Sequence, residues 1–172
     1  MNDKNFSQYI QDHISGQTIR RTPEEVDAVQ IFSKRLTDEY GYSREQIQTR
    51  PQFRIKSSPS GIEKYPIDIA VFKDNKKTYD NLFIIIECKR PNRHDGEKQL
   101  KIYMGLSSAQ IGVWFNGKEH LYIQKILDKQ GHTTYRELPN IPKRNQRVED
   151  IGRYKRSDLK PPINLIPFGN IW

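Results

Sequence analysis

The strongest hydrophobic pattern in the chain consists of two short apolar runs near its middle. The first covers residues 65–72 and the second covers residues 82–90. A polar, turn-rich stretch, residues 73–81, joins them. Runs rich in Ile, Val, Phe and Tyr on either side of a polar connection are typical of a β-hairpin. The sequence therefore predicts two antiparallel strands in this region.

Both strands carry charged residues where a buried strand would disfavour them. If Lys73 pairs with Leu82 across the hairpin, counting back along the strands places Asp68 opposite Glu87. Lys89 follows Glu87 by two residues and so points to the same face of the strand. The pattern predicts two carboxylates and an ammonium group on one face of one sheet.

Two helices are expected to flank these strands. The segment Thr22-Pro23-Glu24-Glu25 reads as an N-cap with Pro at the first helical position and Glu at the third, and Gly41 ends this helix. A second helix follows Pro91, with Asp95 as its expected N-cap. Residues 1–19 are polar with few hydrophobic positions, and a short helix is the expected structure there.

Further strands are predicted on both sides of the hairpin. Residues 52–56 alternate between apolar and polar side chains. Residues 111–115 and 119–126 read as a second hairpin, whose Asn116-Gly117 pair suits a type I′ turn. The expected order is helix, three strands, helix and two further strands. This order predicts an α/β fold with a mixed central β-sheet flanked by helices.

The charged cluster has the chemistry of a metal site. Asp68 and Glu87 would supply hard oxygen ligands for Mg²⁺, and the backbone carbonyl of Cys88 would be a further ligand. A metal held there lowers the pKa of bound water, and Lys89 could orient or deprotonate that water. The alternative is that these residues form ordinary exposed ion pairs near strand ends.

A last pair of polar residues completes a recognisable motif. Gln99 and Tyr103 are four residues apart and share one face of the second expected helix, although Tyr103 would equally suit the core. The ordered set Asp68, Glu87-x-Lys89 and Gln99-x-x-x-Tyr103 resembles the PD-(D/E)xK nuclease superfamily. It looks most like the N-terminal nuclease domain of the type I restriction enzyme R subunit, over roughly residues 20–127. One departure is Ile67, which separates Pro66 from Asp68.

The resemblance implies a restriction-endonuclease-like fold with an α-β-β-β-α-β core and a Mg²⁺-dependent DNA endonuclease, with Mn²⁺ as a possible substitute. It implies that Asp68 and Glu87 bind the metal and that Lys89 is catalytic. Gln99 and Tyr103 would support the site near the scissile phosphate. A Glu on the first helix often faces the metal in this family, so Glu25 (or Glu24) is a further candidate ligand, although helix capping alone would explain Glu25.

The charge balance fits a polyanionic partner, and double-stranded DNA is the expected one. The formal net charge is +8, the pI is near 9.5 and the mean hydropathy is −0.87, although many basic proteins bind nothing specific. Basic residues surround the expected site and would contact phosphates without reading sequence. They are Arg20, Arg21, Arg90, Arg93, Lys98 and Lys101. The single cysteine and the scattered histidines provide no zinc-binding pattern.

Three parts of the chain are expected: an N-terminal extension (1–19), the nuclease domain (20–137), and a basic, Pro-rich arm or linker (138–172). No phosphate-binding loop of a motor is present, so the chain is expected to be a fragment or truncated relative that works with motor, methyltransferase and specificity subunits or domains. No membrane partner is expected, and the absence of a signal peptide or long apolar stretch suggests a cytoplasmic protein.

Other functions remain open on the sequence alone. One is a repair or resolvase-type nuclease of the same superfamily, and another is a nuclease fused to a DNA adenine methyltransferase. A third is a non-catalytic DNA-binding or assembly module that keeps the nuclease fold. That module would bind DNA in a salt-dependent way, and a chelator would not affect the binding.

Overall fold

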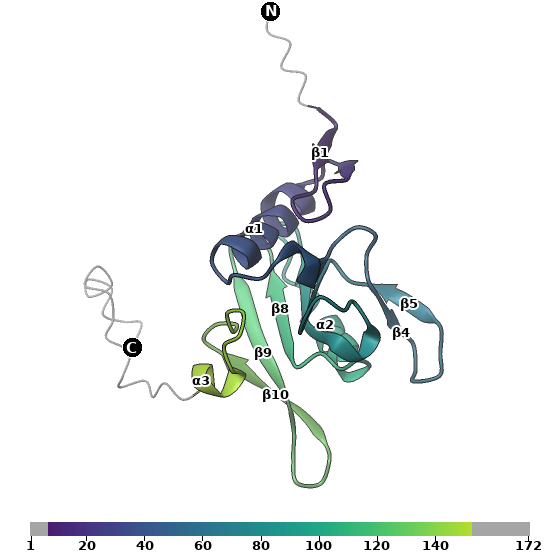
Figure 1. The fold of residues 1–172 in the computed structure, drawn as a ribbon, viewed down its shortest axis with the longest axis vertical. Coiled ribbons are helices and arrows are strands. Elements are labelled where there is room, and N and C mark those ends of the chain that lie inside the picture. The colour runs from purple at the N-terminus through teal and green to yellow at the C-terminus, as the bar shows by residue number, and fades with distance from the viewer. Residues whose placement is uncertain (1–6, 153–172) are drawn as a thin grey trace, which may run out of the picture.

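A six-stranded mixed sheet forms the centre of the protein (Figure 1). The computed structural model describes residues 7–152. The strand order is β10-β9-β8-β7-β6-β3, in which β7 and β8 are parallel and the other neighbours are antiparallel. The strands are β3 (Ile47–Gln48), β6 (Ile69–Phe72), β7 (Leu82–Cys88), β8 (Ile111–Phe115), β9 (His120–Leu127) and β10 (Thr133–Leu138). The α/β fold predicted from the sequence, with a restriction-endonuclease-like arrangement, is confirmed.

Helices pack on both faces of this sheet. On one face η1 (Glu25–Val29, a π-helical turn) leads into α1 (Gln30–Asp38), and on the other face lies α2 (Glu97–Gly105). Strand side chains alternate between the two cores, so Ile84 and Ile86 belong to the α1 core whereas Ile85 belongs to the α2 core. Because Glu87 follows this alternation, it points to the face covered by α2.

Several short elements surround this core. Two of them are separate two-stranded sheets, formed by β1 with β2 and by β4 with β5. Their bounds, with those of the remaining short helices, are β1 (Tyr9–Gln11), β2 (Thr18–Arg20), β4 (Arg54–Lys56), β5 (Glu63–Pro66), η2 (Arg44–Gln46), η3 (Tyr79–Asn81) and α3 (Val148–Gly152). No helix in residues 7–152 is long and apolar enough to cross a bilayer.

The first helix begins and ends largely as predicted. The Thr22 hydroxyl accepts a hydrogen bond from the Glu25 backbone N–H, 3.2 Å away. The Glu25 side chain does not complete the capping box, because it contacts Arg50 and Gln30 instead. After α1, Gly41 has a φ of +73° and turns the chain away from the helix.

The second helix starts differently from the prediction. Its N-cap is Gly96, with φ of +110°, and no side chain caps the helix. Asp95 does not cap it because its carboxylate pairs with the Arg93 guanidinium through two contacts of 2.7 Å. Gly112 on β8 lies under this helix, where a Cβ would collide with Met104. Its lack of a side chain therefore allows α2 to pack closely on the sheet.

The N-terminal segment is a β-hairpin, so the short helix expected there was wrong. Strands β1 and β2 pair from Tyr9 with Arg20 to Gln11 with Thr18. The turn is organised by Asp12, whose carboxylate accepts hydrogen bonds from the backbone N–H and hydroxyl of Ser15, both at 2.8 Å. Short-range polar contacts of this kind compete with helix formation, which explains the outcome.

The turn between β8 and β9 also differs in detail from the prediction. Phe115 pairs with His120, and the Asn116 N–H donates to the Glu119 carbonyl. Gly117 has φ of +88°, but Asn116 does not have a positive φ. A type I′ turn centred on Asn116-Gly117 would require positive φ at both residues, so that assignment was wrong. The predicted hairpin itself is present.

The region after β10 packs on the α1 side of the sheet. Ile141 and Val148 belong to that core. The Tyr42 hydroxyl donates to the Pro142 carbonyl at 2.7 Å, and the Tyr40 hydroxyl contacts Asn140 at 2.6 Å. The first part of the basic segment expected from residue 138 onward is therefore packed against the domain. The remainder, residues 153–172, lies outside the described residues.

Candidate active site

The two central carboxylates meet where one long predicted strand is broken in two. Residues 65–72 form β5 and β6, with Ile67 and Asp68 between them. Strand β6 pairs with β7 from Ile69 with Ile86 onward, so one step further places Asp68 opposite Glu87. The predicted register is therefore confirmed from Ile69 with Ile86 to Val71 with Ile84, and Asp68 lies one residue beyond the paired part of β6.

At the other end of the hairpin the predicted pairing was wrong. Phe72, not Lys73, pairs with Leu82, because a β-bulge shifts the register between Val71 and Phe72. The bulge leaves the pairing near Asp68 unaffected, since it lies on the side of the hairpin loop.

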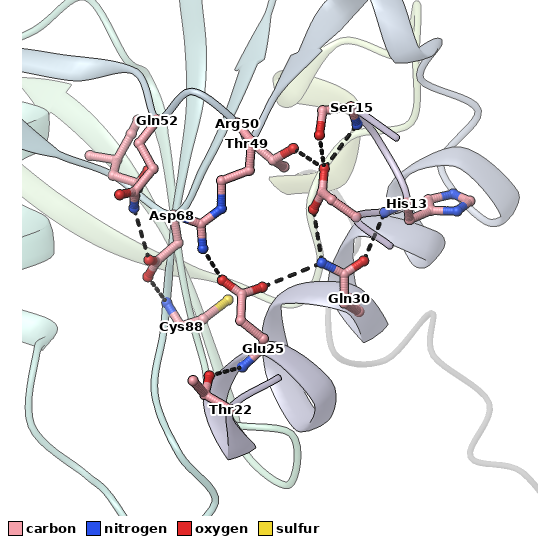
Figure 2. Close-up of polar contacts among 12 residues, drawn as sticks. His13, Ser15, Thr22, Glu25, Gln30, Thr49, Arg50, Gln52, Asp68 and Cys88 are labelled. Carbon is pink, nitrogen blue, oxygen red and sulfur yellow. Dashed lines mark hydrogen bonds and ion pairs between the residues drawn. The ribbon is translucent and has the colours of Figure 1, made fainter. Parts of the chain in front are cut away.

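The break in the strand explains the position of the Asp68 side chain. At the break, the Ile67 N–H turns away from β7 and donates to the Phe53 carbonyl. The Cys88 N–H instead donates a hydrogen bond to Asp68 Oδ2, 2.8 Å away (Figure 2). The N–H and carbonyl of one strand residue point to the same side, so the Cys88 carbonyl also faces the side of Asp68.

Glu87 is the most deeply buried charged residue of this cluster, with 5% of its surface exposed. Its Oε1 atom is buried and has no hydrogen-bond partner within residues 7–152. A buried oxygen without a partner is costly and is often explained by a ligand or ion that satisfies it. Glu87 therefore marks a position where a cation would be stabilised.

Burial and the charges of neighbouring carboxylates raise the pKa of both Asp68 and Glu87. Burial is the main cause for Asp68, and the nearby charges of Glu24 and Glu25 add to it, whereas the Cys88 N–H and Lys89 lower the pKa. For Glu87, burial again comes first and the charge of Asp68 second. A buried carboxylate next to a partly exposed one favours a shared proton or a shared cation.

The donor set fits a hard divalent cation. Asp68 and Glu87 supply carboxylate oxygens, and Mg²⁺ in proteins often has one or two carboxylates with water or phosphate oxygens at its other positions. In residues 7–152, no group of three or more His, Cys, Asp or Glu side chains is placed to hold a metal. A metal here would therefore depend on the two carboxylates, on backbone oxygen and on water or substrate.

Lys89 leaves β7 beside a narrow space on the α2 side. Its backbone N–H bonds the Phe115 carbonyl on β8 at 2.9 Å, and its side chain passes Gly96. A Cβ on Gly96 would lie 2.8 Å from Lys89 Cε and 3.4 Å from Trp114 Nε1. Gly96 therefore leaves room for the lysine side chain in its observed position.

The loop between Lys89 and α2 is held by two side chains from the neighbouring part of the sheet. The Trp114 indole N–H donates to the Asp95 carbonyl at 2.8 Å. The fully buried Asn116 amide donates to the carbonyls of Pro91 and Arg93, at 3.3 and 3.1 Å. Neither role is visible in the sequence, because both contacts join segments separated by more than 15 residues.

Gln99 and Tyr103 lie on one face of α2, as predicted. The Gln99 amide donates to the Tyr103 hydroxyl, and the Tyr103 ring stacks on Tyr65 with centroids 5.3 Å apart. Burial raises the pKa of Tyr103, and the charges of Glu87 and Asp68 add to this effect. The helix face carrying this pair is therefore turned toward the carboxylates.

Glu24 and Glu25 approach the site from η1 and the turn before it. Glu25 is 7% exposed and lies between Arg50, its ion-pair partner, and Gln30 (Figure 2). Glu24 is half-buried, and burial raises its pKa, whereas the neighbouring Lys89 lowers it. Glu25 is thus engaged by an arginine, whereas Glu24 interacts electrostatically with Lys89.

A cleft of about 420 Å³ opens beside Asp68. Its walls come from the N-terminal hairpin, the turn before η1 and the segment after β3. They are formed by Ile19, Arg20, Thr22, Glu24, Glu25, Arg50, Gln52 and Asp68. Arg50 and Gln52 were not identified in the sequence, where no pattern marks them. Only the tertiary fold brings them next to Asp68, whose Oδ1 lies 3.5 Å from Gln52 Nε2.

The basic residues expected to bind DNA are spread around this site. Arg20 lines the cleft, and Arg90 lines an adjoining pocket with Thr22, Pro23 and Glu24. Lys98 is exposed near the start of α2. Arg93 and Lys101 already have acidic partners, Asp95 and Glu97. Arg21 donates to the Ser7 carbonyl.

Comparison with known proteins gives one match. The family model described as type I restriction enzyme R protein N terminus matches residues 23–142, which is more than half of the chain and contains Asp68, Glu87, Lys89, Gln99 and Tyr103. No curated protein and no solved structure matches. The chain belongs to the family of type I restriction enzyme R protein N-terminal domains.

Proposed function

We propose that this protein is a metal-dependent DNA endonuclease domain that hydrolyses phosphodiester bonds with Mg²⁺, or with Mn²⁺ in its place. The observation that carries the proposal is the buried Glu87 Oε1, which has no partner in the described residues, beside Asp68 at the end of the β6–β7 pairing. Family membership supports a nuclease role in a restriction system. It also places the domain in the context of a type I restriction complex, for which we propose motor, methyltransferase and specificity subunits as partners.

In this proposal each residue has a defined role. Asp68, Glu87 and the Cys88 carbonyl hold the metal, which supplies a water of lowered pKa and neutralises charge on the phosphate. Lys89 orients the attacking water or stabilises the developing charge. Gln99 and Tyr103, on α2, support the site near the scissile phosphate. Glu24 is the better candidate than Glu25 for an additional contact, because Glu25 is paired with Arg50.

Basic residues around the cleft would hold the DNA backbone. Arg20, Arg90 and Lys98 are exposed and lie near the cleft or the start of α2. Arg93 and Lys101 would have to exchange their acidic partners for phosphates. Contacts of this kind give affinity that falls with salt and carry no sequence information.

Calorimetric titration with Mn²⁺ in the presence of a short DNA duplex tests the proposed metal site. Wild-type protein is expected to bind the ion, and Asp68→Asn is expected to lose most of this binding. Asparagine keeps an oxygen that can accept the hydrogen bond of the Cys88 N–H but removes the charge. The loss of Mn²⁺ binding should therefore result from the missing metal ligand and not from unfolding.

Asp80→Asn is the matched control, since it removes an exposed carboxylate on η3. This variant should bind Mn²⁺ as the wild type does. Equal binding by the Asp68 and Asp80 variants would show that the metal does not use Asp68 and would contradict the proposal.

Gly96→Ala is expected to slow DNA cleavage by forcing Lys89 out of position. The new methyl group would lie 2.8 Å from Lys89 Cε, so the lysine side chain must move. The residue also has φ of +110°, which costs an L-residue about 1–2 kcal/mol. Plasmid nicking rates, with unfolding in urea measured in parallel, would separate the two effects.

Gly131→Ala provides the control for backbone strain. Gly131 has φ of +83°, and a Cβ there would meet nothing within 4 Å. Both variants should lose stability, but only Gly96→Ala should lose cleavage rate. A similar loss of rate in both would mean that the space beside Lys89 is unimportant.

A further inference from the structure

The β4–β5 hairpin stands apart from the central sheet. It forms its own two-stranded sheet, with Arg54 paired with Pro66 and Ile55 paired with Tyr65. Figure 1 shows it projecting to one side of the domain beyond α2. At its tip, residues 58–60 are exposed, and Ile62 has 73% of its surface exposed. Such a projecting hairpin has a large surface that the domain core does not use.

The base of this hairpin is firmly attached to the core. Ile55 is fully buried, and the Tyr65 ring stacks on Tyr103. The Lys56 backbone N–H donates to the Tyr79 hydroxyl at 3.0 Å, and that hydroxyl donates to the Leu106 carbonyl at 3.0 Å. The hairpin therefore leaves the domain in a fixed direction.

The same base is bonded to the segment that carries Asp68. Directly after β5, the Ile67 N–H donates to the Phe53 carbonyl at 2.9 Å. The Gln52 amide donates to the Ile67 carbonyl at 3.2 Å and lies 3.5 Å from Asp68 Oδ1. The position of the hairpin and the position of the candidate metal ligand are thus set by the same hydrogen bonds.

The charge of the hairpin is mainly positive. Arg54, Lys56 and Lys64 provide three cations against one acid, Glu63. In the described part of the chain none of these three cations forms an ion pair, unlike Arg93. Lys56 and Lys64 instead lie over the rings of Tyr79 and Tyr65, and the Arg54 guanidinium donates to the Lys64 carbonyl. These contacts leave the positive charges without an acidic partner, so a phosphate could pair with them.

We propose that the β4–β5 hairpin is a DNA-contacting arm. Arg54, Lys56 and Lys64 bind phosphates, and the tip, residues 58–62, enters the major groove, which accommodates a two-stranded β-ribbon. This inference rests on the proposed function for its substrate. Ser60 precedes Asp68 by eight residues, which span at most about 26 Å. The arm therefore contacts DNA within about eight base pairs of the bond that is cut, at 3.4 Å per base pair.

The salt dependence of DNA binding tests the role of the three cations. The variant with Arg54, Lys56 and Lys64 all replaced by Gln should reduce the slope of log K against log salt by about two to three. A control variant with Lys76, Lys77 and Lys129 replaced by Gln carries the same change in net charge on other exposed loops. It should leave the slope nearly unchanged. Binding is measured in EDTA, so the result does not depend on the metal site.

Photocrosslinking tests whether the tip touches DNA. The only cysteine, Cys88, is 1% exposed, so a cysteine introduced at Ser60 would be the only accessible thiol. Labelled with an aryl azide, Ser60→Cys should crosslink to duplex DNA, whereas Lys129→Cys, in the β9–β10 turn, should not. Comparable crosslinking by both variants, or equal salt slopes for the two triple variants, would overturn the proposal.

The hairpin proposal and the proposed function can fail separately. Failure of the Mn²⁺ titration with preserved Ser60 crosslinking would remove the metal site and leave the DNA-contacting arm. Normal Mn²⁺ binding without crosslinking would remove the arm only. If the hairpin instead docks another protein subunit, Mn²⁺ binding should be normal and Ser60→Cys should not crosslink to DNA. The two triple variants should then change the salt slope equally.

Discussion

Lys89→Ala is expected to abolish DNA cleavage while leaving the fold and Mn²⁺ binding intact. The charge of the ammonium group lowers the pKa of both Asp68 and Glu87, so Lys89 is the cation that we propose to act on an attacking water. Removing a general acid–base group typically lowers a rate by about 10²–10⁴-fold. Nicking of supercoiled plasmid with Mn²⁺ would measure the loss, and Mn²⁺ calorimetry would show that Asp68 and Glu87 still hold the ion.

Lys129→Ala is the control for this variant, because it removes the same charge from an exposed turn. It should cleave at the wild-type rate. Cleavage by Lys89→Ala at that rate would remove Lys89 from the proposed mechanism. A parallel loss of Mn²⁺ binding would assign it a structural role instead.

Glu87→Gln is expected to stabilise the metal-free protein at neutral and alkaline pH. Burial and the charge of Asp68 raise the pKa of Glu87 well above its usual value, so the folded protein retains a proton that the unfolded chain has released. The free energy of unfolding is therefore highest below the pKa of Glu87 in the unfolded chain, about 4.3. It falls as pH rises toward the pKa of Glu87 in the folded protein. Each unit of pKa difference corresponds to about 1.4 kcal/mol.

Urea unfolding in EDTA across this pH range would measure the effect. The wild type should lose stability as pH rises, and Glu87→Gln should lose much less. Adding Mg²⁺ should stabilise the wild type but not Glu87→Gln, because an ion that binds only the folded state adds to its stability. Glu45→Gln, which removes an exposed carboxylate on η2, should follow the wild type. If Glu87→Gln showed the same pH dependence of stability as the wild type, the pKa of Glu87 would not be raised in the folded protein.

Local sequence patterns were sufficient for the parts of the fold that depend on near neighbours. The apolar run of β7 predicted a buried strand, and the polar connection before it predicted a hairpin. Thr22 predicted the start of the first helix, because its hydroxyl bonds an N–H three residues away. The opposition of Asp68 and Glu87 also followed from local counting, since a hairpin fixes register over short separations.

Predictions failed where another residue, near in the sequence or distant, competed for the same group. Asp95 was expected to cap α2, but Arg93 binds its carboxylate and Gly96 begins the helix. Residues 65–72 were expected to form one strand, but the Ile67 backbone pairs with Phe53 and breaks it. Strand β3, only two residues long, has no hydrophobic run that could mark it in the sequence.

The sequence by itself determined the chemical groups of the candidate site and the register that brings Asp68 and Glu87 together. Only the tertiary structure placed Arg50 beside Glu25, Gln52 beside Asp68 and Gly96 beside Lys89. The physical reason is the range of the interactions. Strand alternation and helix capping act over a few residues, whereas these contacts join separate elements that meet only after the sheet and its helices have packed.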